Sequence, residues 1–191
     1  MVKLNLFGLP YRRVVYIDAS AIVIRPIDQL FALARRGWVA AAPDNGLGLN
    51  PERFNAGFMV AAPDNETLAI MKRLVEGRCL DSYDGADQGF LLSYFTTPTN
   101  RWISLDQKWN TLWRRAKYPD YDWEHIHVLK FVGQEKPWEY SSSPNASTYP
   151  GGESMAEGHP HPFTVWHNFH QRFIDSCPLS LAPGSGSQEQ L

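Results

Sequence analysis

Two short segments carry polar side chains whose types and spacing suit the binding and transfer of a polar group. In the first, Asp18 and Ser20 directly follow the apolar run Val14–Ile17, whose β-branched and aromatic residues predict a buried strand. Open α/β sheets bind ligands just beyond their strand ends. An unpaired carboxylate is expensive to bury, so Asp18 needs a cation, a hydroxyl or a turn N–H. The sequence therefore leaves two options open, a ligand site and a capped turn.

The second segment reads DGADQG, with Asp84 and Asp87 around a glycine and Gln88 at the start of an expected helix. Two carboxylates three residues apart with an adjacent amide suit the recognition of sugar hydroxyls. Asp87 alone would also fit an ordinary helix N-cap. A further segment, FNAG, opens another apolar strand, where Asn55 can point its amide into a cleft, although a plain turn fits the same residues.

Strands and helices alternate along the chain that must position these side chains. Apolar runs lie at 14–17, 21–24, 38–42, 57–62, 102–105 and 128–132. All of them except 21–24, which is only noted as apolar, are predicted strands. Periodic apolar residues predict helices near 27–36, 65–77, 87–95 and 163–173, with a turn at 43–46 and loops at 50–55 and 81–86. Residues 107–124 receive no assignment. This alternation predicts an α/β fold with a mixed, mostly parallel sheet flanked by helices.

Composition indicates a folded domain and excludes several classes of protein. The chain has 191 residues, 43% of them hydrophobic and seven of them Trp, which suits a single core. Its net charge of -2 disfavours a nucleic-acid partner. Its two cysteines, Cys79 and Cys177, form no disulfide framework. No apolar run is long enough to span a bilayer.

These segments, in this order, resemble glycosyltransferase family 8, the glycogenin-like transferases. In that family a D-x-D triplet binds a divalent metal, usually manganese, which holds the diphosphate of a UDP-sugar. The triplet here is DAS, so Ser20 replaces the second carboxylate. The segment 128–138 is similar to the family's H-[FY]-x-G-x-x-K-P-W, but Lys130 stands at the position of its metal-binding His. His127 lies three residues earlier, an odd spacing that predicts the opposite face of the strand.

The resemblance implies a role for each matching residue. It makes Asp87 and Gln88 catalytic and Asp18 a ligand of the metal or of the diphosphate, and it implies substrate-binding roles for Lys3, Asn55, Asp84, Asn110, Lys130, Gly133 and Lys136. It also implies manganese, which the two replaced ligand positions argue against. Two interpretations follow: either Lys130 binds the diphosphate in place of the metal, or it pairs with Asp18 in a site that has lost catalysis.

The implied function is retaining transfer of a hexosyl group from a UDP-sugar to a glycan or another hydroxyl acceptor. The alternative is a non-catalytic relative that binds a glycan or a partner transferase. The expected organisation is a partial, N-terminally truncated transferase domain at 1–175, lacking the uridine-binding βαβ half, with a loop insertion at 139–161 and a disordered tail at 176–191. Homodimers are frequent in the family. The chain as written would be cytoplasmic, and the Golgi lumen would follow if an N-terminal segment preceded it.

Overall fold

The computed structural model describes residues 1–33, 35–44, 50–96, 100–116, 118, 122–142, 149–150 and 158–176, without the side chains of residues 50 and 51. Its elements are η1 (Lys3–Gly8), β1 (Val14–Ile17), β2 (Ala21–Val23), η2 (Asp28–Ala32), β3 (Val39–Asp44), β4 (Asn50–Ala61), α1 (Asn65–Glu76), α2 (Asp87–Thr96), β5 (Trp102–Ser104), η3 (Gln107–Trp109), β6 (Thr111–Leu112), η4 (Trp123–His125), β7 (Val128–Lys130), η5 (Pro137–Glu139) and α3 (Pro162–Ser176). The elements labelled η are 3-10 helices.

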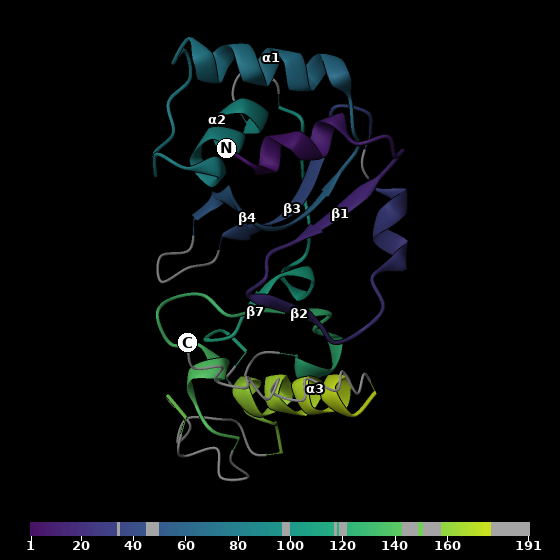
Figure 1. Ribbon diagram of the computed structural model, residues 1–191, viewed down its shortest axis with the longest axis vertical. Coiled ribbons are helices and arrows are strands. Elements are labelled where there is room, and N and C mark those ends of the chain that lie inside the picture. The colour runs from purple at the N-terminus through teal and green to yellow at the C-terminus, as the bar shows by residue number, and fades with distance from the viewer. Residues whose placement is uncertain are drawn as a thin grey trace, which may run out of the picture.

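The described strands form two sheets (Figure 1). The larger sheet has the strand order β1-β4-β3-β5, and the smaller has the order β2-β7-β6. The predicted mixed α/β fold with flanking helices is confirmed. The share of parallel pairing is lower than expected, because β1–β4, β3–β4 and β2–β7 are antiparallel and only β3–β5 and β6–β7 are parallel among the described strands. Residues 45–49 alone separate β3 from β4, whereas a parallel crossover needs about a dozen residues.

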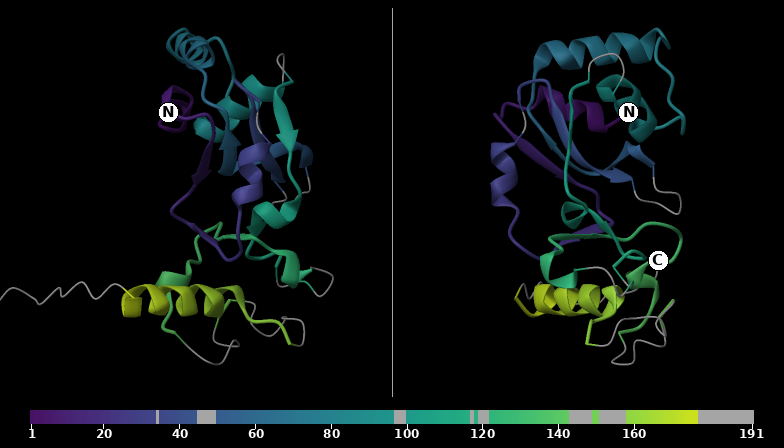
Figure 2. Two further views of the ribbon diagram at one scale, coloured as in Figure 1. Left: turned by 90° about the vertical axis from the view of Figure 1, so that its right-hand side faces the viewer. Right: turned by 180° about the vertical axis from the view of Figure 1, so that it is seen from behind.

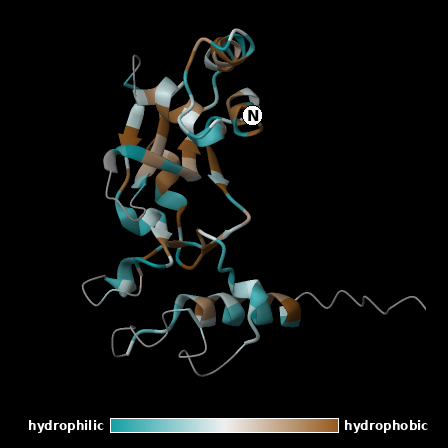
Figure 3. Cartoon of the chain, turned by 90° about the vertical axis from the view of Figure 1, so that its left-hand side faces the viewer, coloured by the Kyte–Doolittle hydropathy of each residue, from teal (hydrophilic) through white to brown (hydrophobic). Residues whose placement is uncertain are grey.

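Both faces of the larger sheet are buried, because successive side chains of β4 point to opposite faces. Met59 and Ala61 pack in a cluster with α1, α2 and η1, whereas Phe58 and Val60 pack on the other face with Leu30 of η2. The hydrophobic colouring of the central strands follows this arrangement (Figure 3). The double burial explains why β4 shows no simple alternation of polar and apolar residues.

A third cluster joins α3 to the smaller sheet. Phe163 of α3 packs against Phe131, directly after β7, and against Trp113. The helix therefore lies on the side of the molecule away from α1 (Figure 2). Across the part of the chain that the structure describes, no helix is long and apolar enough to cross a membrane.

Several predicted boundaries need correction. The predicted loop 50–55 and the first half of the predicted turn 43–46 belong to strands, because Pro43 pairs with Phe54 across a register shift between β3 and β4. The predicted helix 27–36 contains only the short 3-10 helix η2. The predicted helices at 65–77, 87–95 and 163–173 are present as α1, α2 and α3. The predicted tail beyond residue 176, residues 45 and 46 of the turn and most of the predicted insertion 139–161 lie outside the described residues.

Candidate functional site

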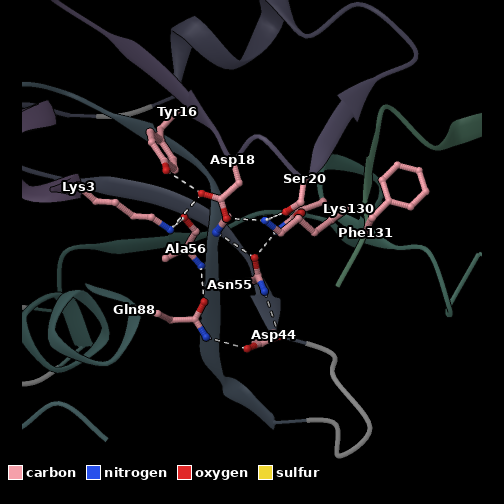
Figure 4. Close-up of polar contacts among 12 residues, drawn as sticks. Lys3, Tyr16, Asp18, Ser20, Asp44, Asn55, Ala56, Gln88, Lys130 and Phe131 are labelled. Atoms are coloured by element: carbon pink, nitrogen blue, oxygen red, sulfur yellow. Dashed lines mark hydrogen bonds and ion pairs between the residues drawn. The ribbon is translucent and has the colours of Figure 1, made fainter. Parts of the chain in front are cut away.

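The triplet of Asp18, Ala19 and Ser20 lies where the chain passes from β1 of the larger sheet to β2 of the smaller one. The Asp18 N–H donates to the Gly57 carbonyl oxygen (2.9 Å), and the Ala21 N–H donates to the Asp18 carbonyl oxygen (3.0 Å). Because these bonds fix the backbone, the Asp18 side chain has a defined direction at the junction between the two sheets (Figure 4).

The Asp18 carboxylate contacts three donors. Its Oδ1 accepts a hydrogen bond from the Tyr16 hydroxyl (2.6 Å) and lies 3.2 Å from Lys3 Nζ, and its Oδ2 forms an ion pair with Lys130. Burial alone would raise the pKa of Asp18, but the hydrogen bonds from Lys130 and Tyr16 and the nearby ammonium charges lower it below its ordinary value. Burial and the Asp18 carboxylate raise the pKa of Tyr16 to about 12. Asp18 is therefore ionised at neutral pH.

Lys130 is the last residue of β7, and its ammonium lies between the first and third residues of the triplet. Its Nζ donates to Asp18 Oδ2 and to Ser20 Oγ (2.8 Å), and the side chain is only 7% exposed. Burial lowers the pKa of Lys130, and the Asp18 carboxylate partly opposes that shift. A Cβ atom at Gly57 would lie 2.6 Å from Lys130 Cε, so this glycine provides the space for the lysine. The structure contains the ion pair of Lys130 with Asp18, which is one part of the second interpretation; the loss of catalysis in that interpretation stays a prediction.

These residues do not fit the manganese that the resemblance implies. Of the three positions concerned, only Asp18 offers a carboxylate, and its oxygens already accept from an ammonium and a hydroxyl. A protonated lysine has no lone pair for a metal. Within the described residues, no group of three His, Cys, Asp or Glu side chains could hold a metal ion. His127 contacts the Pro26 carbonyl oxygen (2.7 Å) rather than this cluster.

Gln88, in the first turn of α2, joins three parts of the fold. Its Oε1 accepts from the Ala56 N–H (2.8 Å), and its Nε2 donates to Asp44 Oδ2 (2.9 Å) and to the Tyr83 hydroxyl (2.7 Å). The amide therefore ties the start of α2 to β4 and to the end of β3. Lys3 Nζ reaches the same backbone from the other side, donating to the Ala56 carbonyl oxygen (2.9 Å).

Asn55 and Asn110 form a buried polar pair beside Gly57, whose carbonyl oxygen accepts from the Asp18 N–H. The Asn110 Nδ2 donates to Asn55 Oδ1 (3.1 Å), which also accepts from the Gly57 N–H (2.9 Å). The Asn55 Nδ2 lies 3.3 Å from Asp44 Oδ1. Asn110 Oδ1 is buried and has no hydrogen-bond partner within the described part of the chain. Asn55 therefore links Asp44 to Asn110 and holds the backbone beside Asp18.

The two carboxylates of the DGADQG segment differ in their surroundings. Asp84 Oδ1 accepts from the Ser82 hydroxyl (2.8 Å) and from the N–H groups of Ala86 (2.9 Å) and Gly89 (3.0 Å). Although burial would raise the pKa of Asp84, these hydrogen bonds lower it. Asp84 thus stabilises the start of α2. Asp87 Oδ1 is buried and has no hydrogen-bond partner among the described residues.

Lys136, Gly133 and Trp138 border the cluster on the side of the smaller sheet. Lys136 Nζ donates to the Phe131 carbonyl oxygen (2.5 Å) and lies 5.7 Å from the centre of the Trp138 ring. Gly133 has a φ of +83°, the left-handed region that favours glycine, next to the Arg114 guanidinium. Trp138 faces the triplet across a cavity of about 540 Å³, which Tyr16, Asp18, Ala19 and Ser20 also line.

Sequence reasoning missed two residues of this site. Tyr16 lies two positions before Asp18. Because side chains two residues apart point to the same face of a strand, the sequence could have predicted that Tyr16 lies beside Asp18. Asp44 contacts both Gln88 and Asn55, but it was assigned to a turn because it follows Pro43. Only the pairing of β3 with β4 brings it to the site.

Two mixed sheets with flanking helices and a polar cleft at their junction define a fold shared with nucleotide-sugar transferases. A solved galactosyltransferase, LgtC in complex with donor and acceptor sugar analogues, aligns with a TM-score of 0.51 at 17% identity, covering 79% of this chain and 62% of that one. The model of glycosyl transferase family 8 matches residues 2–142. The chain therefore belongs to glycosyl transferase family 8.

Glycogenins are among the similar curated proteins. Glycogenin of Neurospora crassa is 35% identical over 152 residues, which cover 77% of this chain and 21% of that protein. Glycogenin-1 of Mus musculus is 29% identical over 174 residues, which cover 87% of this chain and 50% of that protein. The chain thus spans half or less of the length of these relatives.

Proposed function

We propose that this chain carries out glycogenin-like hexosyl transfer, moving a sugar with retention of configuration from a UDP-sugar to a hydroxyl group of a glycan or similar acceptor. The observation that carries this proposal is the convergence of Lys3, Asp18, Asn55, Gln88 and Lys130, from five separate segments, at one junction between the sheets. Membership of family 8 and the names of the similar glycogenins support it.

Each residue has a proposed role. The ammonium groups of Lys3 and Lys130 attract the diphosphate of the donor and stabilise the negative charge that develops as it leaves. Lys136 adds a third positive charge near Lys130, since its charge contributes to lowering the Lys130 pKa after the larger effect of burial. Asp87 places its carboxylate near the reacting carbon of the sugar, as the resemblance to the family implies. Gln88 positions the backbone on which the sugar lies.

The proposed reaction proceeds without a divalent metal. The Lys130 ammonium lies between Asp18 and Ser20, where it supplies positive charge directly. Its position is fixed by two hydrogen bonds and by burial, so little reorganisation is needed when charge develops on the donor.

The test is release of UDP from UDP-glucose by the 191-residue chain, with a saccharide acceptor, in EDTA and in added Mn²⁺. We expect similar rates in both, and a loss of about a hundredfold in kcat for Asp87→Asn, which is typical for the loss of one group that stabilises charge in the transition state. Asp81→Asn, an exposed residue of the neighbouring loop, is the matched control. An Asp87→Asn variant with the wild-type rate would contradict the role of Asp87, and a strict Mn²⁺ requirement would contradict the metal-free reaction.

The second candidate function is non-catalytic binding of a glycan or a partner transferase. It is favoured by one observation, that Lys130, Lys3 and Tyr16 already occupy the Asp18 carboxylate. Under this alternative no UDP is released in EDTA or in Mn²⁺, while a saccharide still binds. The same assay therefore separates the two functions.

A further inference from the structure

A second cavity, of about 580 Å³, lies between α3 and the segment that begins at η5. Its walls include the rings of Trp138, Tyr140 and Trp166 and the amides of Asn168 and Gln171. The cavity is separate from the Asp18 cluster, and nothing in the transfer chemistry described above uses it.

The aromatic side chains of this cavity are held in place by one another. The rings of Trp138 and Trp166 lie 6.0 Å apart at 54°, and His170 stacks on Trp166 at 4.8 Å and 14°. Trp138 is nevertheless 47% exposed. A partly exposed indole in a supported orientation offers a flat apolar face that is ready for a ligand and loses little freedom on binding.

The polar groups of the cavity include hydroxyls, amides and imidazoles. Its lining residues include no Asp, Glu, Lys or Arg within the part of the chain that the structure describes. Burial and the neighbouring His170 lower the pKa of His167, which keeps this lining side chain uncharged at neutral pH. His167 Nε2 is buried without a hydrogen-bond partner in the described residues. Amides and imidazoles beside aromatic faces suit a ligand that has many hydroxyls and no charge.

The cavity shares one lining residue with the cavity of the transfer site. Trp138 lines this cavity and also the cavity of the Asp18 triplet. The ammonium groups beside Asp18 therefore lie on one side of the indole, and a lining without Asp, Glu, Lys or Arg among the described residues lies on the other.

We propose that the cavity of Trp138 and Trp166 binds the sugar rings of a neutral oligosaccharide, so that an acceptor hydroxyl extends past Trp138 toward Asp18 and Asp87. This inference rests on the proposed function, because it makes the bound saccharide the acceptor of the transfer. It assigns the acceptor to the side of α3 and the donor diphosphate to the side of the lysines.

The test is isothermal titration of maltotetraose, and separately of cellotetraose, into the wild-type chain and two variants. Trp166→Ala is expected to weaken binding of the preferred oligosaccharide about tenfold, because it removes a stacking surface. Phe169→Ala removes an exposed ring from the same helix outside the cavity and is expected to leave binding unchanged. Circular dichroism of both variants checks that α3 is still folded, and Trp166→Phe, which keeps a ring, is expected to retain part of the affinity.

The outcomes separate this inference from the proposed function. If Trp166→Ala loses saccharide binding while the wild-type chain releases no UDP, the saccharide site stands and transfer fails. If UDP is released and Trp166→Ala binds the saccharide as the wild type does, transfer stands and the site is overturned. Absence of wild-type binding of either probe at ~10 mM would also overturn the site.

Discussion

The charges at the junction of the two sheets depend on one another. Lys130 is nearly buried and Asp18 is one-quarter exposed, so each would be costly to keep in the fold without its partner. Removing one partner of a buried ion pair leaves an uncompensated charge, which destabilises more than the pair itself stabilises. The ion pair is thus a condition for keeping an ammonium at the point where a sugar diphosphate would bind.

Asp18→Asn tests this dependence. We expect it to lower the free energy of unfolding by about 3 kcal/mol, because Lys130 would lose its counter-charge in a poorly hydrated site. Ser20→Ala, which removes only a neutral acceptor, should cost about 1 kcal/mol. Urea unfolding followed by tryptophan fluorescence measures both. Equal stability of Asp18→Asn and the wild type would show that the ammonium needs no partner there.

At the residue scale, the sequence predicts which kind of group a buried side chain requires, but not which residue supplies that group. That Asp18 requires a cation or a hydroxyl follows from the cost of burying it, and the structure supplies Lys3, Lys130 and Tyr16. That Asp44 belongs to the site could not be predicted, because its contacts depend on how β3 pairs with β4.

Among the elements, α1 has its stabilising contacts concentrated at its start. Asp64 is the N-cap: its Oδ2 accepts from the Thr67 N–H (2.9 Å) and hydroxyl (2.7 Å), and its Oδ1 accepts from Arg36 Nε (2.7 Å). The Thr67 hydrogen bonds, and then the Arg36 guanidinium, lower the pKa of Asp64 below its ordinary value of 3.8. The lowered pKa means that the ionised carboxylate stabilises the folded state.

Asp64→Ala should therefore destabilise the protein in a pH-dependent way. At pH 7 we expect a loss of about 1 kcal/mol, the usual worth of an N-cap. Because the folded pKa lies below the unfolded one, this stabilisation is complete above the unfolded pKa and is lost as the pH falls through the folded one. The difference between wild type and variant should shrink below about pH 4, as measured by unfolding at several pH values.

Glu66→Ala is the matched control, since Glu66 lies in the same first turn but is exposed. It separates the effect of the cap from the general effect of a negative charge near a helix start. A pH-independent difference for Asp64→Ala would contradict the lowered pKa.

The bounds of α1 and α3 could be predicted from their own residues, whereas the start of β4 could not. The cap and the apolar period of α1 lie within its own sequence, as do the apolar residues of α3. The first half of β4 contains Glu52 and Arg53, and its strand conformation comes from pairing with β3 rather than from its own residues.

For the molecule as a whole, the metal-free reaction proposed above rests on the donor set at the sheet junction. The double variant Ser20→Asp/Lys130→His would place a second carboxylate and an imidazole beside Asp18, a set that suits a divalent ion. We expect the melting temperature of this variant to rise as the Mn²⁺ concentration increases. At a hundredfold excess of Mn²⁺ over Kd, the free energy of unfolding should be about 3 kcal/mol higher. Thermal unfolding of the wild type should not respond to Mn²⁺ or to EDTA.

Each single substitution is the control, since neither completes the set. A wild-type melting temperature that rises with Mn²⁺ would show that the Lys130 ammonium can be displaced. Failure of the double variant to respond would show that the junction cannot take up metal-binding geometry even with suitable donors.

Because Trp138 is a wall of both cavities, the two ligands are expected to influence each other's affinity. Both ligands would contact the same indole, so the second ligand meets a ring whose position the first has already biased. Such coupling is reciprocal: a UDP-sugar that tightens saccharide binding by some factor must itself be tightened by the saccharide by the same factor. The strength of this coupling between donor and acceptor would then depend on one side chain.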